Sequence, residues 1–419
     1  MSTKQRPPSA KRAAALAAAA EILAKRRFAQ RLYGTLAILA LLAGGLSAAN
    51  VAKLPRPNAT SALLRSSAPA AFSLYTLERD PGKDAAGAKK PDTIRGANLT
   101  GGGEPTTIAS APRIQEFAAL PSALAVVTLN EDNTSALEVV PLAGGPATLV
   151  PLPGRGTVEN LRAAGAGHLV GFTFTASSVS EQYRKTLFVY DIDSPSSGPR
   201  AVQGISGNVS AADWRFVPGT TKLVAQTDDR SLFLLDALGA GKVSPLGTHA
   251  GILGIVPGTN ELAVSDPGLQ KGIDPPRYST INLATGALTP LALTGTSGSG
   301  ALTNGATTTA AQPVILDSSG KYVQVVSNYD AGKETAVVNL SDKGSPRQLY
   351  KPAAEWSSIQ DVCTDPTGNY LAVETSAPQY IGDQYPVRPE PTPMRTDLVD
   401  LKSGTVLKSL PGSIPSWCS

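Results

Sequence analysis

A unit of short strands and tight turns recurs through most of this chain, and this repeat limits the fold more than any other feature. Its clearest copy is FVPGTTKLVAQTDDRSLFLLDALGAGKVSPLG, residues 216–247. Each copy has a Pro or Gly turn, a strand, a variable hairpin, a second strand, a Gly turn and a third strand. The copies recur every 40 to 60 residues, roughly, and such a period with four short strands per unit is typical of the blades of a β-propeller. The sequence therefore predicts an all-β fold.

The residues within one strand of the repeat support this prediction. In KLVAQTD, Leu223 and Ala225 are expected to face one side of the sheet and Val224 the other. The segments SLFLLD and TLFVYD are apolar on both sides. Such runs are expected of strands that are covered on both faces, as in the middle of a blade between two neighbouring blades.

The two ends of the repeat region predict one further blade beyond the six complete copies. Residues 71–110 contain segments that match the later strands of a repeat but lack a first strand, whereas SIPSWCS, residues 413–419, matches a first strand and aligns Trp417 with Trp214. We therefore expect a β-propeller of about seven four-stranded blades over residues 71–419, closed by both termini, with six blades as the alternative. A ring closed in this way leaves no strand edge for another chain to pair with.

The first 70 residues differ in composition from the repeats. Residues 1–31 are basic and rich in Ala, so we expect a cytoplasmic segment that is partly helical. Residues 32–52, LYGTLAILALLAGGLSAANVA, carry no charge and have the length of one transmembrane helix. The basic residues before this helix predict that everything after it is exported. Residues 53–70 are rich in Pro, Ser and Ala and are expected to form a linker.

This organisation predicts a single-pass protein of a bacterial cytoplasmic membrane, with its N-terminus in the cytoplasm and the propeller in the periplasm or on the cell surface. The alternative is a cleaved signal peptide, because SAAN offers small residues at a cleavage site. The preceding 31 residues are long for the start of a signal peptide and favour an uncleaved anchor.

The distribution of charge argues against nucleic acid as a partner. The chain has a net charge of +4, and residues 1–31 contribute +7 from eight basic residues and one acidic residue. The remainder therefore carries −3, which gives the propeller no electrostatic reason to bind nucleic acid.

The chain contains two cysteines, Cys363 and Cys418. The alignment of the repeats places them at the same level on the innermost strands of neighbouring blades. Paired cysteines in an exported protein are usually bonded, so we predict a Cys363–Cys418 disulfide where the ring closes. The alternative is two buried thiols that do not meet.

Four segments carry a resemblance to a known family: LDSSGKYVQVVS, CTDPTGNYLAVET, VVNLSDKG and LVDLKSGT. They resemble the WD40-like repeats of TolB-type β-propellers, and the terminal IPSW resembles the PSW that opens such repeats. The resemblance covers residues 71–419 in outline, although FVPG and IVPG depart from the family's usual Ser-Pro-Asp-Gly turn. It implies the fold more firmly than the role, because TolB itself is a soluble periplasmic protein.

The sequence contains no motif that predicts catalysis, a cofactor or a metal. His168 and His249 belong to different repeats without a Cys or His cluster around them, so we do not expect a zinc site. GTSGSG, residues 295–300, is expected to be a flexible loop, because a nucleophile elbow needs Gly-x-Ser-x-Gly between a strand and a helix.

Two sets of residues are candidates for binding. Polar groups on innermost strands could bind a cation or sugar in the central channel, with ordinary turn and rim positions as the alternative. These candidates are Asn208, Asp213, Glu355, Gln360 and Asp361. The insertion 377–397 holds Tyr380, Tyr385 and Arg388, residue types that suit a protein contact, with a passive loop as the alternative.

We therefore expect a membrane-anchored, extracytoplasmic propeller that serves as a binding platform for envelope or membrane proteins. One alternative is an enzyme, such as a lactonase or another hydrolase centred on the channel, which rests on analogy of fold. Another is a ligand sensor that signals through the anchor to the N-terminal helix.

Overall fold

A computed structural model describes most of the repeat region, and contacts divide the chain into two units, residues 1–60 and 61–419. The described residues are 73–79, 90–99, 103–164, 167–177, 185–204, 207–239, 243–268, 275–294, 302–303, 306–330, 333–344, 346–356, 358–377 and 394–417. Within these ranges, no helix has both the length and the apolar character needed to cross a membrane. The predicted cytoplasmic segment, transmembrane helix and linker lie outside the described residues.

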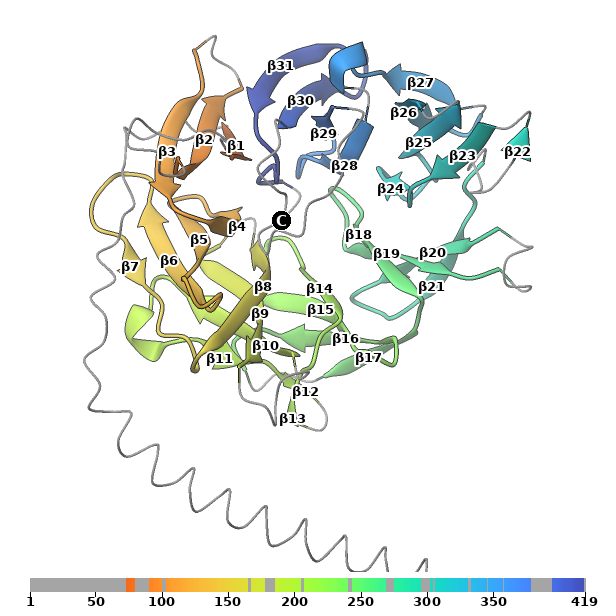
Figure 1. Cartoon of the computed structure of the whole chain (residues 1–419). Helices are drawn as coiled ribbons and strands as arrows, with labels where there is room; N and C mark the ends of the chain where they lie inside the picture. Colours follow the sequence, from red (N-terminus) through yellow and green to blue (C-terminus); the bar gives the residue numbers. More distant parts are fainter. Residues whose placement is uncertain are drawn as a thin grey trace, which may run out of the picture. The chain divides into compact units, whose positions relative to one another are not determined.

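The second unit is a ring of seven antiparallel sheets, the blades of a β-propeller (Figure 1). Blade 2 contains β4(Ile114–Ala119), β5(Ala123–Leu129), β6(Ser135–Pro141) and β7(Thr148–Leu149). Blade 3 contains β8(Gly156–Ala163), β9(Leu169–Ala176), β10(Lys185–Asp191) and β11(Arg200–Ala201). Blade 4 contains β14(Asp213–Phe216), β15(Lys222–Gln226), β16(Ser231–Asp236) and β17(Ser244–Thr248).

Blades 5 to 7 follow in chain order around the ring. Blade 5 contains β18(Gly251–Ile255), β19(Glu261–Asp266), β20(Arg277–Asn282) and β21(Leu288–Leu291). Blade 6 contains β24(Val314–Ile315), β25(Tyr322–Asp330), β26(Lys333–Ser341) and β27(Arg347–Tyr350), and the short β22(Leu302–Thr303) and β23(Ala306–Ala310) extend it. Blade 7 contains β28(Ser358–Thr364), β29(Tyr370–Ser376), β30(Met394–Asp400) and β31(Val406–Pro411).

Three short elements lie outside the blade sheets, the first within the β10–β11 connection of blade 3 and the other two between blades. They are η1(Pro195–Ser197), η2(Ala354–Trp356) and a two-stranded hairpin of β12(Gln203–Gly204) and β13(Gly207–Asn208).

Blade 1 is built from both ends of the repeat region, as the sequence predicted. Its sheet contains β1(Ser73–Glu78), β2(Asp92–Asn98) and β3(Thr106–Ala111), in that order. The C-terminal segment joins β1 through an antiparallel bridge between Leu77 and Ser413, whose backbone amides each donate to the other's carbonyl. The prediction of about seven blades is therefore confirmed, and the alternative of six is wrong.

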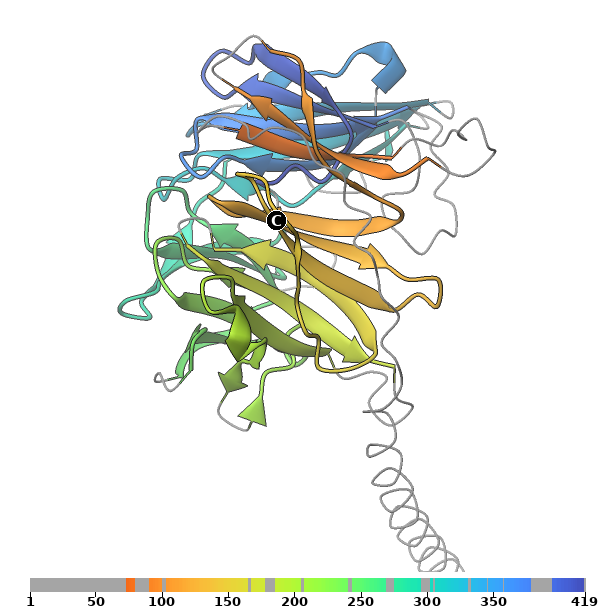
Figure 2. The ribbon, with the colours of Figure 1, turned by 90° about the vertical axis from the view of Figure 1, so that its left-hand side faces the viewer.

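Apolar side chains fill the spaces between neighbouring blades. The blades stack as separate sheets when the ring is seen from the side (Figure 2). Leu223 and Ala225 of β15 pack in a cluster with residues of blade 3, whereas Val224 packs with residues of blade 5. This alternation follows from the period of two along a strand. The core is thus divided among the interfaces between blades.

Candidate binding site at the ring axis

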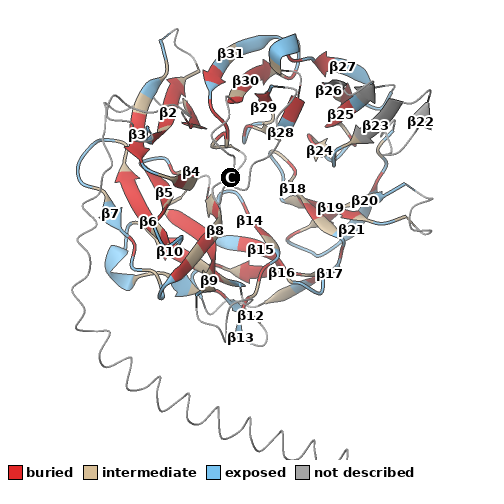
Figure 3. Ribbon diagram, viewed as in Figure 1, coloured by how far each residue is buried: buried red, intermediate tan, exposed pale blue. Residues whose placement is uncertain are grey.

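Charged side chains from several blades gather at the innermost strands of the ring. They are Glu116 on β4, Arg162 on β8, Asp213 and Arg215 on β14, Asp361 on β28 and Glu374 on β29. We call these six residues the axial cluster. Figure 1 shows β4, β8, β14 and β28 around the centre of the ring, and Figure 3 shows less burial at their ends than in the middle strands.

Asp213 is the point at which two arginines of the cluster meet. The guanidinium of Arg215 donates to Asp213 Oδ1 and also, at 2.8 Å, to the carbonyl of Trp214. The Nη2 atom of Arg162 lies 3.6 Å from the same carboxylate oxygen. The side chains of Arg162, Asp213 and Arg215 are 15%, 31% and 27% exposed, so solvent reaches all three.

Arg162 is held at the axis by the packing beneath it. Its guanidinium lies 5.8 Å from the ring centroid of Trp214, which is fully buried. A Cβ atom on Gly171 would collide with that indole, so only glycine leaves room for it. Burial, followed by the nearby charge of Arg215, lowers the pKa of Arg162 to about 10.

A bulge in β8 brings Glu116 into the cluster. The register of β8 against β9 shifts between Glu159 and Arg162, where Asn160 adopts a positive φ of 53°. This turn directs the backbone amides of Asn160 and Leu161 toward Glu116, which accepts them at 3.3 and 2.7 Å. Burial raises the pKa of Glu116, and these two amides oppose the increase.

Asp361 and Glu374 bring two carboxyl groups from blade 7. A second bulge, between Ile359 and Asp361, displaces β28 at this point, and Asp361 is exposed. The surrounding protein nevertheless keeps water away from the carboxyl group of Asp361, and this desolvation raises its pKa. The charges of Arg215 and Arg162 oppose that increase. Asp361 and Arg162 influence each other's pKa, although Asp361 belongs to blade 7 and Arg162 to blade 3.

Glu374 is the most perturbed carboxyl group of the cluster. Its residue is 7% exposed, and burial together with the charge of Asp361 raises its pKa to about 8. Its Oε1 atom accepts a 2.6 Å hydrogen bond from the backbone amide of Ile414, in the segment that completes blade 1. Glu374 therefore connects the axial cluster to the closure of the ring.

The structure places the predicted channel residues in different surroundings. Asp213 and Asp361 lie in the axial cluster, and Gln360 lies beside them on β28, where its amide donates to the hydroxyls of Ser358 and Ser376. Glu355 is exposed in η2, before the innermost strand begins, and Asn208 is exposed in the β12–β13 hairpin. The expectation that these two lie on innermost strands is wrong, because the chain turns at both places.

Of the other predicted residues, the structure describes only Cys363. Tyr380, Tyr385 and Arg388 lie outside the described residues. Cys363 lies on β28 opposite Ala372 and is not a free thiol, but Cys418 lies outside the described residues. The pairing of the two cysteines therefore stays a prediction.

Sequence reasoning missed Glu116, Arg162, Arg215 and Glu374. Arg215 follows Asp213 by two residues on one strand, so the period of two offered a signal that both share a face. The other three reach the cluster through bulges or from a neighbouring strand, and no pattern in the sequence shows this.

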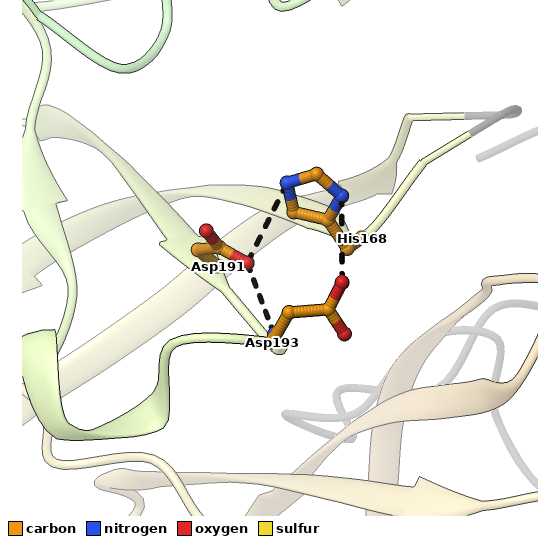
Figure 4. A group of neighbouring side chains, drawn as sticks. All are labelled: His168, Asp191 and Asp193. Carbon is orange, nitrogen blue, oxygen red and sulfur yellow. Dashed lines mark hydrogen bonds and ion pairs between the residues drawn. The ribbon is translucent and has the colours of Figure 1, made fainter.

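A second group of polar side chains lies at one end of blade 3 (Figure 4). One ligand atom from each of His168, Asp191 and Asp193 lies within 4.8 Å of the others. Asp191 faces Nε2 of the imidazole at 3.6 Å, whereas Asp193 faces Nδ1 at 3.7 Å. Because the two carboxylates address opposite ring nitrogens, the arrangement suits ion pairs with an imidazolium better than a single metal ion.

Asp191 also performs an ordinary local task in its turn. It accepts the backbone amide of Asp193 at 3.0 Å. Asp236 and Asp400 accept amides in the corresponding turns of blades 4 and 7. The position of Asp191 is therefore explained by turn formation.

Comparisons with known proteins give likeness in fold alone. No family model and no curated protein sequence matches the chain. Among solved structures, the propeller domain of the Trilobed protease from Pyrococcus furiosus is 11% identical, with a TM-score of 0.49, covering 81% of this chain and 94% of that one. TolB from Acinetobacter baumannii is 14% identical, with a TM-score of 0.41, covering 83% and 65%. An oligogalacturonate lyase in complex with manganese is 12% identical, with a TM-score of 0.45, covering 74% and 93%.

The strand pairing by itself defines the class of this protein. It is a seven-bladed β-propeller whose first blade is completed by the segment after β31. TolB proteins are among the solved structures to which it is similar.

Proposed function

We propose that this protein is a binding propeller, tethered to the bacterial cytoplasmic membrane, that holds a protein partner in the cell envelope through its axial cluster. The observation that carries the proposal is the convergence of two arginines with four carboxyl groups at the axis of a closed ring. Side chains of both signs that stay partly exposed can pair with opposite charges on a partner and reject a wrong one. The uncharged segment 32–52 and the basic residues before it support the tether.

Site-specific crosslinking in intact cells tests this proposal. A photo-crosslinking amino acid in place of Gln360, which is exposed beside the axial cluster, should capture a discrete partner protein. The matched control places the same group at Leu288, which is 54% exposed on the outermost strand of blade 5. Capture at both positions alike, or at neither, would contradict a partner at the axis.

Deletion of residues 378–393, the part of the predicted binding loop that leaves β30 intact, shows in the same cells whether this loop contributes. If every partner crosslinked at Gln360 persists after the deletion, that loop is not the contact site. Loss of the partner with the ring still folded would assign Tyr380, Tyr385 and Arg388 to the interface.

One feature favours a second candidate function, a hydrolase or lyase acting at the axis. Burial and the charge of Asp361 raise the pKa of Glu374 to about 8, and a neighbouring pair of carboxyl groups with unequal proton affinity is the arrangement used for general acid and base catalysis. An enzyme of this kind should turn over an ester or glycoside probe and lose activity about 100-fold in Glu374→Gln. A rate that does not change in this variant would exclude the carboxyl pair as its catalyst.

A further inference from the structure

Arg162 is a mostly buried cation whose donors are only partly used within the part of the chain that the structure describes. Its Nε atom is buried without a hydrogen-bond partner. Its ion pair with Asp213 spans 3.6 Å, which is longer than a hydrogen bond. A guanidinium offers five N–H donors, and leaving buried donors unpaired costs about 1–3 kcal/mol each. Arg162 therefore has unused capacity for an acceptor that comes from outside.

Asp213 does not satisfy Arg162, because the oxygen that faces Arg162 lies 3.6 Å away and already accepts two other donors. Its Oδ1 atom accepts the guanidinium of Arg215 and, at 2.8 Å, the backbone amide of Trp214. Arg162 reaches the same oxygen only from the longer distance. The two arginines thus share one carboxylate oxygen, which leaves the buried Nε donor of Arg162 without an acceptor among the described residues.

The position of Arg162 is fixed before any ligand arrives. The indole of Trp214 supports its guanidinium, and Gly171 leaves space for that indole. A planar cation held on an aromatic face loses little freedom on binding, which favours a planar acceptor with two oxygens.

The charges around the two arginines determine which anion fits. The charge of Asp361, in blade 7, acts on both arginines, and the charge of Glu116, in blade 2, acts on Arg162. A phosphate dianion would be repelled by these carboxyl groups, whereas a carboxylate brings one charge and the flat geometry that pairs with a guanidinium through two parallel hydrogen bonds. Repulsion between Arg162 and Arg215 would also be relieved by one negative charge placed between them.

We infer that Arg162 and Arg215 form a binding site for a single carboxylate group, presented by the ligand at the ring axis. This inference deepens the proposed function by naming the chemistry through which the axis recognises its partner. The carboxylate belongs either to an acidic side chain of a protein segment or to a small free acid, and both would use the same two guanidinium groups.

Titration of the full chain in detergent or nanodiscs tests this site, with arginine Nε–H signals observed by NMR. The probes are acetate, succinate, inorganic phosphate, and two amidated, N-acetylated pentapeptides of sequence GSEGS and GSQGS. We expect saturable shifts with acetate or the Glu peptide, weaker shifts with the dianion succinate and none with the Gln peptide. Affinity should fall about tenfold in Arg162→Lys, because lysine lacks the two parallel donors. Stronger binding of the Glu peptide than of the free acids would identify a protein segment as the source.

Two further variants keep the test decisive. In Asp361→Asn, loss of the nearby negative charge should raise carboxylate affinity, whereas Asp193→Asn at the exposed end of blade 3 should leave it unchanged. If Arg162→Lys does not fold, the Asp361→Asn result decides. Equal binding of the Glu and Gln peptides, tighter binding of phosphate, or unchanged affinity in Asp361→Asn would each overturn the inference.

These experiments can contradict either proposal without contradicting the other. A partner still crosslinked at Gln360 in Arg162→Lys, with no carboxylate binding in wild type, leaves the platform in place and removes the carboxylate site. Saturable carboxylate binding without any crosslinked protein leaves the site in place and removes the protein partner.

Discussion

The interface between blades 3 and 4 and the interface between blades 7 and 1 occupy equivalent places in the ring but are held together differently. Between blades 3 and 4, a large apolar cluster surrounds Trp214, and β14 pairs with β15 from Asp213 to Phe216. Between blades 7 and 1, the described apolar cluster is small and centres on Leu74, Ala97 and Leu410. Apolar burial therefore contributes less to the closure of the ring than to the interface within it.

Hydrogen bonds from side chains to the backbone compensate at the closure. Thr76 Oγ1 donates to the carbonyl of Pro411 at 2.8 Å, and Thr396 Oγ1 donates to that of Gly412 at 2.9 Å. Glu374 accepts the amide of Ile414. The Thr76 bond joins parts of the chain that are 335 residues apart, so forming the closure costs more loop entropy than pairing consecutive strands. Directional hydrogen bonds therefore specify the register of the closure, where there are too few apolar contacts to do so.

Deletion of residues 413–419 removes the closure and should have the largest effect. The edge of β1 loses the backbone pairing at Leu77 and Tyr75, and an unpaired edge favours association with other chains. We expect the propeller to melt at a clearly lower temperature and to aggregate on heating, as measured by calorimetry and light scattering. Deletion of residues 2–8 is the control of equal length. A melting temperature equal to that of the control would show that the closure does not stabilise the ring.

Replacement of the two aligned tryptophans compares the interfaces directly. Trp214→Ala removes a fully buried side chain and should lower the free energy of unfolding by about 3–5 kcal/mol. Trp417→Ala removes a half-buried side chain and should lower it by less than half as much. Urea unfolding followed by circular dichroism provides both values. Equal losses would mean that the closure depends on apolar packing as strongly as blade 4 does.

The sequence predicted the ring and its closure because both depend on local patterns. Alternation in KLVAQTD and the Gly turns define the strands, and the match of SIPSWCS with a first strand predicted that the C-terminal segment joins blade 1. The structure confirms that contact, but as a single bridge at Ser413 followed by a turn and not as a full strand. Only two of the six residues of the axial cluster, Asp213 and Asp361, were predicted. Arg162 reaches Asp213 because β8 bulges at Asn160. Glu374 of blade 7 accepts the amide of Ile414 in the segment that completes the neighbouring blade 1. Bulges and contacts between distant strands are set by tertiary packing, so the spacing of residues does not reveal them.

The predicted Cys363–Cys418 disulfide would add a covalent bond at the closure and none between blades 3 and 4. Disulfides typically contribute about 2–4 kcal/mol, so Cys363→Ser should lower the free energy of unfolding by that amount. Wild-type protein treated with a phosphine reductant serves as the matched comparison. Non-reducing peptide mapping of protein from the cell envelope gives the direct check, and two free thiols there would show that the bond does not form.

The pKa of Glu374 predicts a pH dependence that is confined to the closure. This pKa is raised from 4.5 to about 8 in the folded protein, so its contribution to stability is full below pH 4.5 and is lost as pH rises through 8. Stability should therefore fall between pH 5 and pH 9, by more than about 1.4 kcal/mol, the value of one pKa unit. Glu374→Gln keeps an acceptor for Ile414 and should flatten this decline, whereas Glu131→Gln at an exposed turn should not. The same slope in Glu374→Gln as in wild type would assign the pH dependence to another group.

The smallest expected effect comes from one hydroxyl at the closure. Thr76 is fully buried, and Thr76→Val keeps its shape while removing the donor to the carbonyl of Pro411. The loss should be about 1 kcal/mol, because a buried acceptor then lacks its partner. Thr280→Val is the matched control, since Thr280 is also buried on a strand but makes no side-chain hydrogen bond within the described residues. Urea unfolding should show Thr76→Val less stable than Thr280→Val; equal stability would mean that the hydroxyl bonds specify the register of the closure without stabilising it.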